Sequence, residues 1–200
     1  MRPSTIEKQQ KIIEIATALF LEQGYKDTSL DQIVALTGGS KQTLYRYFSN
    51  KEGLFKAVLV EKTKSVDPIF DFCGKHGQSV RESLQQFGHA YLHLICGNPI
   101  LGLFRIVSND FYCNEEFSQL FWQNGPRRAH AYLVNYLEQD VVQAQLSIRD
   151  PALACSQLLG LIRQDYHSQA MLGCELPPDE VLAPHIDTCI DAFFMLYQRR

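Results

Sequence analysis

Residues 28–55 read TSLDQIVALTGGSKQTLYRYFSNKEGLF, and this stretch decides the fold of the N-terminal part of the chain. Ser29 followed three positions later by Gln32 forms a capping box, which predicts the start of a helix. Apolar residues then recur on one helical face until Gly38-Gly39 end the pattern after about two turns. The sequence therefore predicts a short helix followed by a tight glycine turn.

A second short helix is predicted after the glycine turn. Ser40 is suited to cap it, and only Leu44 and Phe48, four residues apart, are expected to point inward. Two short helices joined by a glycine turn, the second with a polar outward face, are the requirements of a helix-turn-helix. Such a helix can enter the major groove, where Gln and Thr bond base edges and Lys or Arg reach guanine or phosphate. The side chains expected on this outward face are Lys41, Gln42, Thr43, Tyr45 and Arg46.

Phosphate contacts are expected beside this face. The hydroxyls of Tyr45 and Tyr47 are long enough to reach phosphate oxygens. Lys51 begins the next predicted helix, where a cation and free backbone N–H groups together suit a phosphate group. The alternative is a small three-helix packing unit with an ordinary solvated face, and composition alone leaves both interpretations open.

The same stretch resembles the N-terminal signature of the TetR family of regulators. The segments that carry the resemblance are ALFLEQGY (18–25), TSLDQI (28–33) and SKQTLYRYFSNKEGLF (40–55), in register from about Ile6 to Phe55. The resemblance implies an all-helical homodimer with paired N-terminal heads, usually a repressor that a small ligand releases from DNA. Together with the outward face, it implies these DNA contacts: Thr28, Ser29, Ser40, Lys41, Gln42, Thr43, Tyr45, Arg46, Tyr47 and Lys51.

One residue departs from the pattern of that family. Members commonly have a small aliphatic residue just before the cap of the recognition helix, where this chain has Gly39. Glycine loses more backbone entropy on ordering than any other residue. We therefore expect the head to be mobile until it meets DNA.

Charge divides the chain into two parts. The formal net charge of the whole chain is −3, but residues 1–65 hold ten Lys/Arg against seven Asp/Glu, and residues 66–200 hold nine against fifteen. A cationic head on an acidic body suggests that the head meets phosphate. We predict a helix-turn-helix DNA-binding domain over residues 1–50 and a ligand-binding and dimerisation domain over residues 51–200.

Every long segment has the apolar spacing of a helix, and none shows the strict alternation of a half-buried strand. Glycine and proline joints divide the chain into about nine helices, which predicts an all-α fold. The N-terminus lacks the apolar core of a secretory signal, and no apolar run approaches the ~20 residues that span a bilayer. We therefore expect a cytoplasmic protein with no membrane partner.

The C-terminal part also resembles a known group. From Leu101 to Tyr197 the chain is similar to the C-terminal domain of AefR-like members of the TetR family. The segments that carry this resemblance are LFR (103–105), residues 117–128 and the helix around Tyr132-Leu133. The resemblance points to repressors and names no ligand.

The last two long helices carry apolar faces suited to a dimer interface. The final helix has two apolar stripes, and a helix that is apolar on two sides needs two surfaces to bury against. The helix before it has a smooth face of small and medium residues. Together they predict an apolar four-helix interface between two copies, the alternative being a monomer that buries both stripes. The predicted interface residues are Ala152, Cys155, Leu159, Ile162, Leu182, Ile186 and Phe193.

Between the head and this interface lies a mixture of aromatic and polar residues. Apolar pockets with a few convergent polar groups are typical of small-molecule sites, although helix bundles also fill their cores with aromatic side chains. We predict a small organic effector, neutral or cationic because the body is acidic, although Arg105, Arg127 and Arg128 leave room for a carboxylate. The candidate pocket residues are His89, His93, Phe104, Arg105, Phe111, Trp122 and His167.

Metal and catalytic chemistry are each suggested by one pair of residues. His89 and His93 have the i,i+4 spacing of a metal pair, but the sequence assigns no third ligand, so no metal or cofactor is predicted. Asp165 and His167 could belong to a hydrolase triad, but no G-x-S-x-G, P-loop or G-x-G-x-x-G motif is present. We therefore predict no catalytic residues. Besides the repressor and the enzyme, the third hypothesis is a DNA-binding structural or adaptor protein without an effector.

Six cysteines are scattered through the chain without any C-x-x-C pair. Zinc sites and disulfide frameworks both bring cysteines together, and clustered spacing is their usual sign. We expect buried, inert thiols in a reducing compartment. The six residues are Cys73, Cys96, Cys113, Cys155, Cys174 and Cys189.

Overall fold

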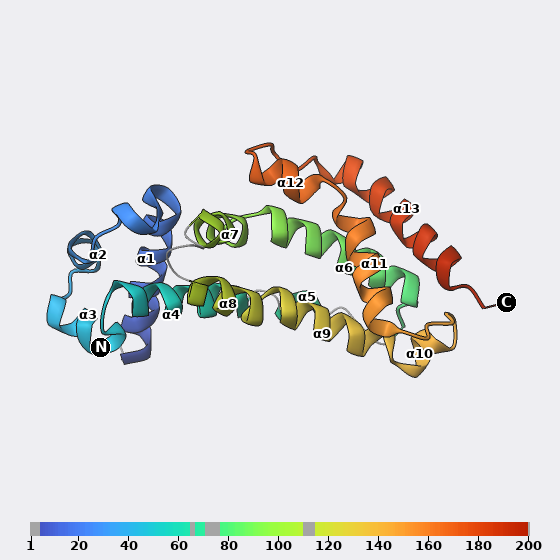
Figure 1. Cartoon of the computed structure of the whole chain (residues 1–200), viewed down its shortest axis with the longest axis horizontal. Coiled ribbons are helices and arrows are strands. Elements are labelled where there is room, and N and C mark those ends of the chain that lie inside the picture. Colours follow the sequence, from blue (N-terminus) through green and yellow to red (C-terminus); the bar gives the residue numbers. More distant parts are fainter. Residues whose placement is uncertain (1–4, 65–66, 71–76, 110–114, 200) are drawn as a thin grey trace. The chain divides into compact units, whose positions relative to one another are not determined.

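The computed structural model describes residues 5–64, 67–70, 77–109 and 115–199, and these residues are mostly helical. Figure 1 labels their helices α1 to α13 in chain order. In the described residues the β pairing is limited to one isolated antiparallel bridge between Leu146 and Gln198. The prediction of an all-α fold is confirmed. The short helices α5 (Asp67–Phe70), α10 (Asp140–Gln143) and α12 (Tyr166–Met171) add to the long segments that the apolar spacing predicts.

The chain packs as two compact units, of which the first comprises Met1–Lys64 and Gly102–Asn124, and the second Ser65–Leu101 and Gly125–Arg200. This packing groups α4 and α8 with the head. The functional boundary expected at residue 50 is a separate matter and stays a prediction. The first unit contains α1 (Thr5–Asp27), α2 (Leu30–Thr37), α3 (Lys41–Phe48), α4 (Lys51–Thr63), most of α7 (Ile100–Asn109) and α8 (Glu115–Asn124). The second contains α5, α6 (Val80–Cys96), α9 (Pro126–Leu137), α10, α11 (Pro151–Arg163), α12 and α13 (Asp179–Tyr197).

The ends of α1 and α2 follow from local sequence signals. Gly24 has φ +82°, as its place near the end of α1 predicts, but its ψ of 169° is extended, so one further turn follows before Asp27. Ser29 and Gln32 form the predicted capping box: the Ser29 hydroxyl accepts from the Gln32 amide at 3.2 Å, and the Ser29 amide donates to the Gln32 side chain at 2.7 Å. Gly38 ends α2 in the left-handed conformation at φ +67°.

An aromatic cluster holds α8 against the first helices of the chain. The ring of Phe55 in α4 lies 4.9 Å from that of Phe20 in α1 and 4.8 Å from that of Phe117 in α8. Tyr25 lies 5.1 Å from the same Phe117 ring, measured between centroids. Edge-to-face contacts of this kind add to the stabilisation that apolar burial supplies. The head therefore has a core that includes a helix more than fifty residues downstream of its predicted boundary.

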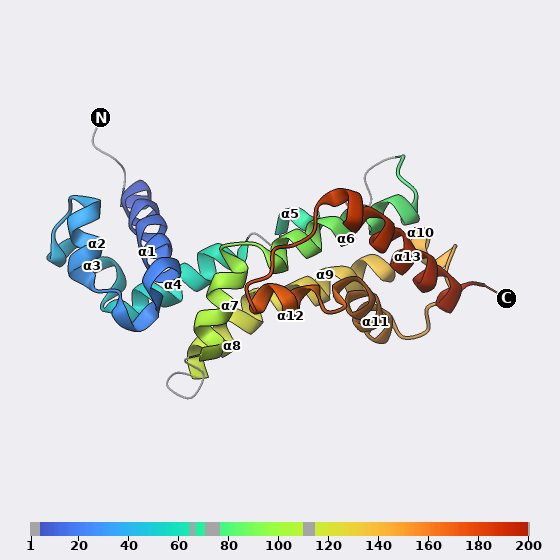
Figure 2. The same ribbon diagram turned by 90° about the horizontal axis from the view of Figure 1, so that it is seen from above.

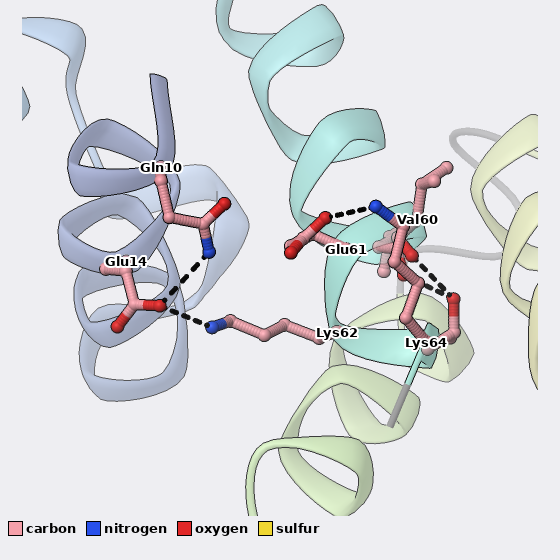
Figure 3. A network of polar contacts seen from close by, with 8 residues as sticks. Gln10, Glu14, Val60, Glu61, Lys62 and Lys64 are labelled. Atoms are coloured by element: carbon pink, nitrogen blue, oxygen red, sulfur yellow. Dashed lines mark hydrogen bonds and ion pairs between the residues drawn. The ribbon is translucent and has the colours of Figure 1, made fainter. Parts of the chain in front are cut away.

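Polar contacts at the surface join α1 to α4 (Figure 3). The Lys62 ammonium lies 3.4 Å from a Glu14 carboxylate oxygen, and the Gln10 side chain donates to the same oxygen at 3.3 Å. Lys64 donates to Glu61 at 2.6 Å, and this contact lowers the pKa of the Glu61 carboxyl. Exposed pairs of this kind contribute less than about 1 kcal/mol each to stability. The aromatic core therefore supplies most of the stabilisation between these helices.

In the second unit, α13 packs beside both α6 and α11 (Figure 2). Gly88 in α6 allows the close approach of α13, because a β-carbon there would lie 3.0 Å from a side-chain carbon of Ile186. Polar pairs flank this contact: Gln85 donates to Asp187 at 2.6 Å, and Arg81 donates to Asp191 at 2.5 Å.

The predicted dimer interface needs a correction. Most of its residues lie in the core that α11 and α13 form with each other and with α6 and α9, because the same apolar spacing serves packing within one copy as well as between copies. Leu159 packs against that core half-buried, and only Ala152 is exposed. The members that are buried in the core of one copy are Cys155, Ile162, Leu182, Ile186 and Phe193.

Two further findings bear on the sequence predictions. Gly125 separates two helices, as its place among the glycine and proline joints predicts, since α8 ends at Asn124 and α9 begins at Pro126. Among the described residues no single helix is long and apolar enough to cross a membrane; only the bent pair Val80–Cys96 and Ile100–Asn109 meets the length and composition criteria together.

Candidate nucleic-acid interface

The recognition helix α3 rests on the head by one narrow edge. Leu44 and Phe48 are its buried residues, as the sequence predicts. This spacing leaves the rest of the helix surface for solvent, because residues four apart lie above one another on one face. The exposed side chains on that surface are Lys41, Gln42, Tyr45 and Arg46, with Thr43 and Tyr47 half-buried.

The N-terminus of α3 is capped by Ser40. Its hydroxyl accepts from the Thr43 amide at 3.2 Å, and the hydroxyls of Ser40 and Thr43 are 3.0 Å apart. A side-chain cap stabilises a helix by about 1 kcal/mol. Ser40 therefore stabilises the start of α3 in the protein without DNA. Both the amide and the hydroxyl of Thr43 contact the Ser40 hydroxyl.

Two basic side chains of α3 have partners on the head. Lys41 forms an ion pair with Asp31 of α2 at 2.5 Å, and this contact raises the pKa of the Lys41 ammonium. The Arg46 guanidinium lies 5.0 Å from the centre of the Tyr47 ring and donates to its hydroxyl at 3.3 Å. Both groups are exposed, so these contacts orient them without removing them from solvent.

Lys51 lies at the first residue of α4, next to the end of α1. Its ammonium donates to the backbone carbonyl of Lys26 at 2.9 Å and lies 4.7 Å from the centre of the Tyr25 ring. Asn50 caps α4 by accepting from the Gly53 amide at 2.7 Å. The arrangement combines a helix N-terminus with a cation, which is the combination that favours a phosphate oxygen.

The side chains of Thr28 and Ser29 form hydrogen bonds within the head. Thr28 is 1% exposed, and its hydroxyl is 2.8 Å from the Gly24 carbonyl and 3.3 Å from the Leu19 carbonyl. Its side chain is therefore inside the head rather than on its surface, which corrects the contact that the resemblance implies. The Ser29 hydroxyl is exposed but caps α2.

Gly53 is a residue of this region that the sequence reasoning missed. A β-carbon at this position would lie 2.1 Å from the backbone carbonyl oxygen of Phe48. The turn from α3 to α4 therefore needs glycine on steric grounds. Asn50 three residues before Gly53 marks an N-cap, but the cap uses only the backbone amide of Gly53 and so gives no signal that the position needs glycine.

The predicted pocket residues do not belong to one unit. Phe104, Arg105 and Trp122 lie in the first unit, and His89, His93 and His167 in the second. Phe111 lies outside the described residues. Trp122 is 60% exposed, whereas the Phe104 ring packs 5.9 Å from that of Phe121. In the second unit an open groove along α6 includes His89 among its lining residues.

Burial raises the pKa of each thiol that the structure describes within a helix. It raises the pKa of Cys155 to about 12 and that of Cys96 to about 11, and it also raises the pKa of Cys189. Cys155 and Cys189 are buried as predicted and Cys96 is half-buried; thiols with raised pKa are poor nucleophiles and metal ligands, so their inertness stays a prediction. Cys174 differs because it is exposed, and Cys73 and Cys113 lie outside the described residues.

The comparisons with known proteins cover both halves of the chain. Residues 12–58 match the family model of bacterial regulatory proteins of the tetR family, and residues 82–199 match that of the AefR-like transcriptional repressor C-terminal domain. Over 58 residues the chain is 45% identical to the HTH-type transcriptional repressor ComR of Escherichia coli, which is 29% of this chain and 27% of that protein. Other curated relatives are also matched over only about a third of their length.

Solved structures match over nearly the whole chain. A TetR-family transcriptional regulator from Mesorhizobium loti is 25% identical with a TM-score of 0.90, covering 99% of this chain and 100% of that one. The flavonoid-responsive regulator FrrA is 30% identical with a TM-score of 0.81, covering 96% of this chain and 98% of that one. These relatives are transcriptional regulators or repressors by name. The chain belongs to the TetR family of bacterial transcriptional regulators, with an AefR-like C-terminal domain.

Proposed function

We propose that this protein is a homodimeric repressor that binds a roughly palindromic operator through α3 and is released by a small organic effector in the cytoplasm. The observation that carries the proposal is the exposed polar face of α3. Gln42 and Arg46 project from a helix that a Ser40 cap and two buried residues hold in place. Side chains of these types can bond base edges in the major groove, while Lys51 and the start of α4 bind phosphate.

We infer the dimer surface from the outer faces of α11 and α13. Four large apolar side chains are exposed on these two helices: Leu153 (53%), Val181 (52%), Met195 (71%) and Leu196 (62%). Gly160 on α11 is also exposed, and a β-carbon there would meet nothing within 4 Å. Exposed apolar groups on adjacent helices favour burial against a second copy. This surface replaces the buried stripe that the sequence suggests.

The effector is expected to be a small organic molecule, neutral or cationic. Support for an aromatic ligand comes from the flavonoid-responsive regulator, which is 30% identical over nearly the whole chain. The contact of α8 with α4 could transmit a movement to the DNA-binding surface. The Phe117 and Phe55 rings are in contact, and Glu116 forms an ion pair with Lys56 at 2.7 Å. A ligand that moves α8 would therefore move α4 with it.

The proposal is tested first on DNA. Fragments of the source genome that bind the protein are selected, and their affinity is measured by fluorescence anisotropy at several salt concentrations. Two recognition helices on one face of DNA require half-sites about 34–36 Å apart or a multiple of that spacing. Gln42→Ala should change the preference among bases at one half-site position, by about 1–3 kcal/mol for a bidentate contact. Gln86→Ala, which is exposed on α6, is the matched control and should change nothing.

Effector release is tested separately. Thermal-shift screening of varied compounds, flavonoids among the first, is followed by operator binding with each hit. A ligand that binds the DNA-incompetent state 100-fold more tightly gives a coupling near 2.7 kcal/mol. A selective operator whose affinity no stabilising compound changes would favour the adaptor alternative, a DNA-binding protein without an effector.

A further inference from the structure

The end of α6 and the start of α13 bring together two imidazoles and a carboxylate. His89 and His93 lie one turn apart on α6, and Asp179 is the first residue of α13. One ligand atom of each residue lies within 4.8 Å of the other two. The pair at i,i+4 is visible in the sequence, but the third group comes from 86 residues further along the chain.

One of the three residues, His89, takes no part in the contacts within this group. The Nε2 atom of His93 is 2.8 Å from Oδ1 of Asp179. The half-buried ring of His89 makes no hydrogen bond to the part of the chain that the structure describes. An ordinary surface ion pair would account for His93 and Asp179 alone. It does not account for a second imidazole directed at the same place.

We propose that His89, His93 and Asp179 form a binding site for a divalent transition-metal ion, with Zn²⁺ the best match. Two imidazole nitrogens and one carboxylate oxygen are ligands that Zn²⁺ prefers, and they leave a fourth position for water. Ligand atoms about 2.0–2.2 Å from zinc lie roughly 3.3–3.6 Å apart in a tetrahedron. The exposed side chains of His93 and Asp179 have room to close that distance by rotation. This inference does not depend on DNA binding.

A bound ion would add a further link between α6 and α13, which already pack against each other. The metal would take the place of the contact between His93 and Asp179, and both imidazoles must be neutral to bind it. We therefore expect zinc to raise the melting temperature of the protein, and its affinity to fall as the solution is acidified. The native state is stabilised because it holds the preformed site and the unfolded chain does not.

The test uses the metal-free full-length protein and Zn²⁺ in competition with a chromophoric chelator. We expect one zinc ion per protomer, with affinity reduced at least about tenfold in His89→Gln and in Asp179→Asn, because even the loss of a group that only orients a zinc ligand costs about 10–100-fold. Binding of Co²⁺ should give the visible absorption of a tetrahedral site in the wild type only. His167→Gln, on α12 and outside the group, is the matched control and should bind as the wild type does.

Cys174 needs its own control because it is an exposed thiol five residues before Asp179. Cys174→Ser should keep the zinc affinity if the proposal holds. Zinc bound equally by the wild type and His89→Gln, zinc lost only in Cys174→Ser, or no binding at micromolar concentrations would each overturn it. Circular dichroism of each variant without metal separates loss of the site from loss of the fold.

Discussion

The helices α3 and α13 are held in place by different kinds of contact. Both helices bury about a quarter of their residues, two of eight in α3 and five of nineteen in α13, but only α3 begins with a side-chain cap. Side-chain caps at Ser40 and Asn50 stabilise the starts of α3 and α4. The outer surface of α3 is therefore available to bind another molecule. α13 depends instead on long-range packing along its inner face. The comparison teaches that a helix can present a polar surface when local contacts, rather than burial, hold its ends.

Glycine is used differently in the two units. Gly53 brings backbone against backbone at the turn from α3 to α4, where a β-carbon would be 2.1 Å from the Phe48 carbonyl oxygen. Gly88 brings α6 close to a side chain of α13, with Ile186 at 3.0 Å. A side chain can shift to a new rotamer, but a backbone carbonyl cannot move without its turn. The head should therefore tolerate less change at its glycine than the body does.

The largest effect should separate the inner from the outer face of α13. Phe193→Asp places a charge in the core of the second unit and should destabilise it by at least about 3–5 kcal/mol, the cost of losing a buried Phe alone. Met195→Asp, on the exposed face, should leave the melting temperature nearly unchanged while the protein becomes a monomer with weak operator binding. Sedimentation and thermal melting measure both. A Met195→Asp dimer with normal operator affinity would show that the interface lies elsewhere.

The next effect tests the backbone contact in the head. Gly53→Ala should destabilise the first unit by about 1–3 kcal/mol, the usual range for overpacking, and should abolish specific operator binding because the turn after α3 must shift. Urea denaturation and anisotropy are the measurements. Unchanged binding by a folded Gly53→Ala protein would mean that the turn can adjust without moving α3.

A smaller effect is expected from the phosphate contact proposed for Lys51. Lys51→Ala should weaken binding to all DNA sequences by about tenfold and reduce the slope of log affinity against log salt by about 1. Lys64→Ala is the matched control, because that side chain is exposed and paired with Glu61. If the two variants had equal slopes, the proposed contact at the start of α4 would be wrong.

The smallest effect concerns the departure at Gly39. This residue has no positive φ, and a β-carbon would meet only the Thr37 hydroxyl at an ordinary 3.6 Å. Gly39→Ala should therefore raise the free energy of unfolding by about 0.4–1 kcal/mol, mainly by restricting the unfolded chain. If the free head is mobile as the sequence suggests, hydrogen exchange in α2 and α3 should slow in the variant. A destabilised Gly39→Ala protein would show that the turn needs glycine after all.

The sequence by itself determined the short elements of the head. Ser29, Gln32, Ser40 and Gly38 act within four residues of their own positions, so their effects can be derived from spacing alone. The same local pattern predicted Leu44 and Phe48 as the buried edge of α3. The burial of Thr28 could not be derived in this way, because its partners are carbonyls on the preceding helix.

Only the tertiary structure decided which residues from distant parts of the chain meet. It joined α8 to the core of the head through Phe117, and it turned the stripe of Phe193 toward its own chain rather than toward a partner. It also brought Asp179 to His89 and His93. Apolar spacing says that a face is buried but not against what, since helices of one chain and of two copies offer the same kind of surface. The choice depends on contacts across tens of residues, which no local pattern encodes.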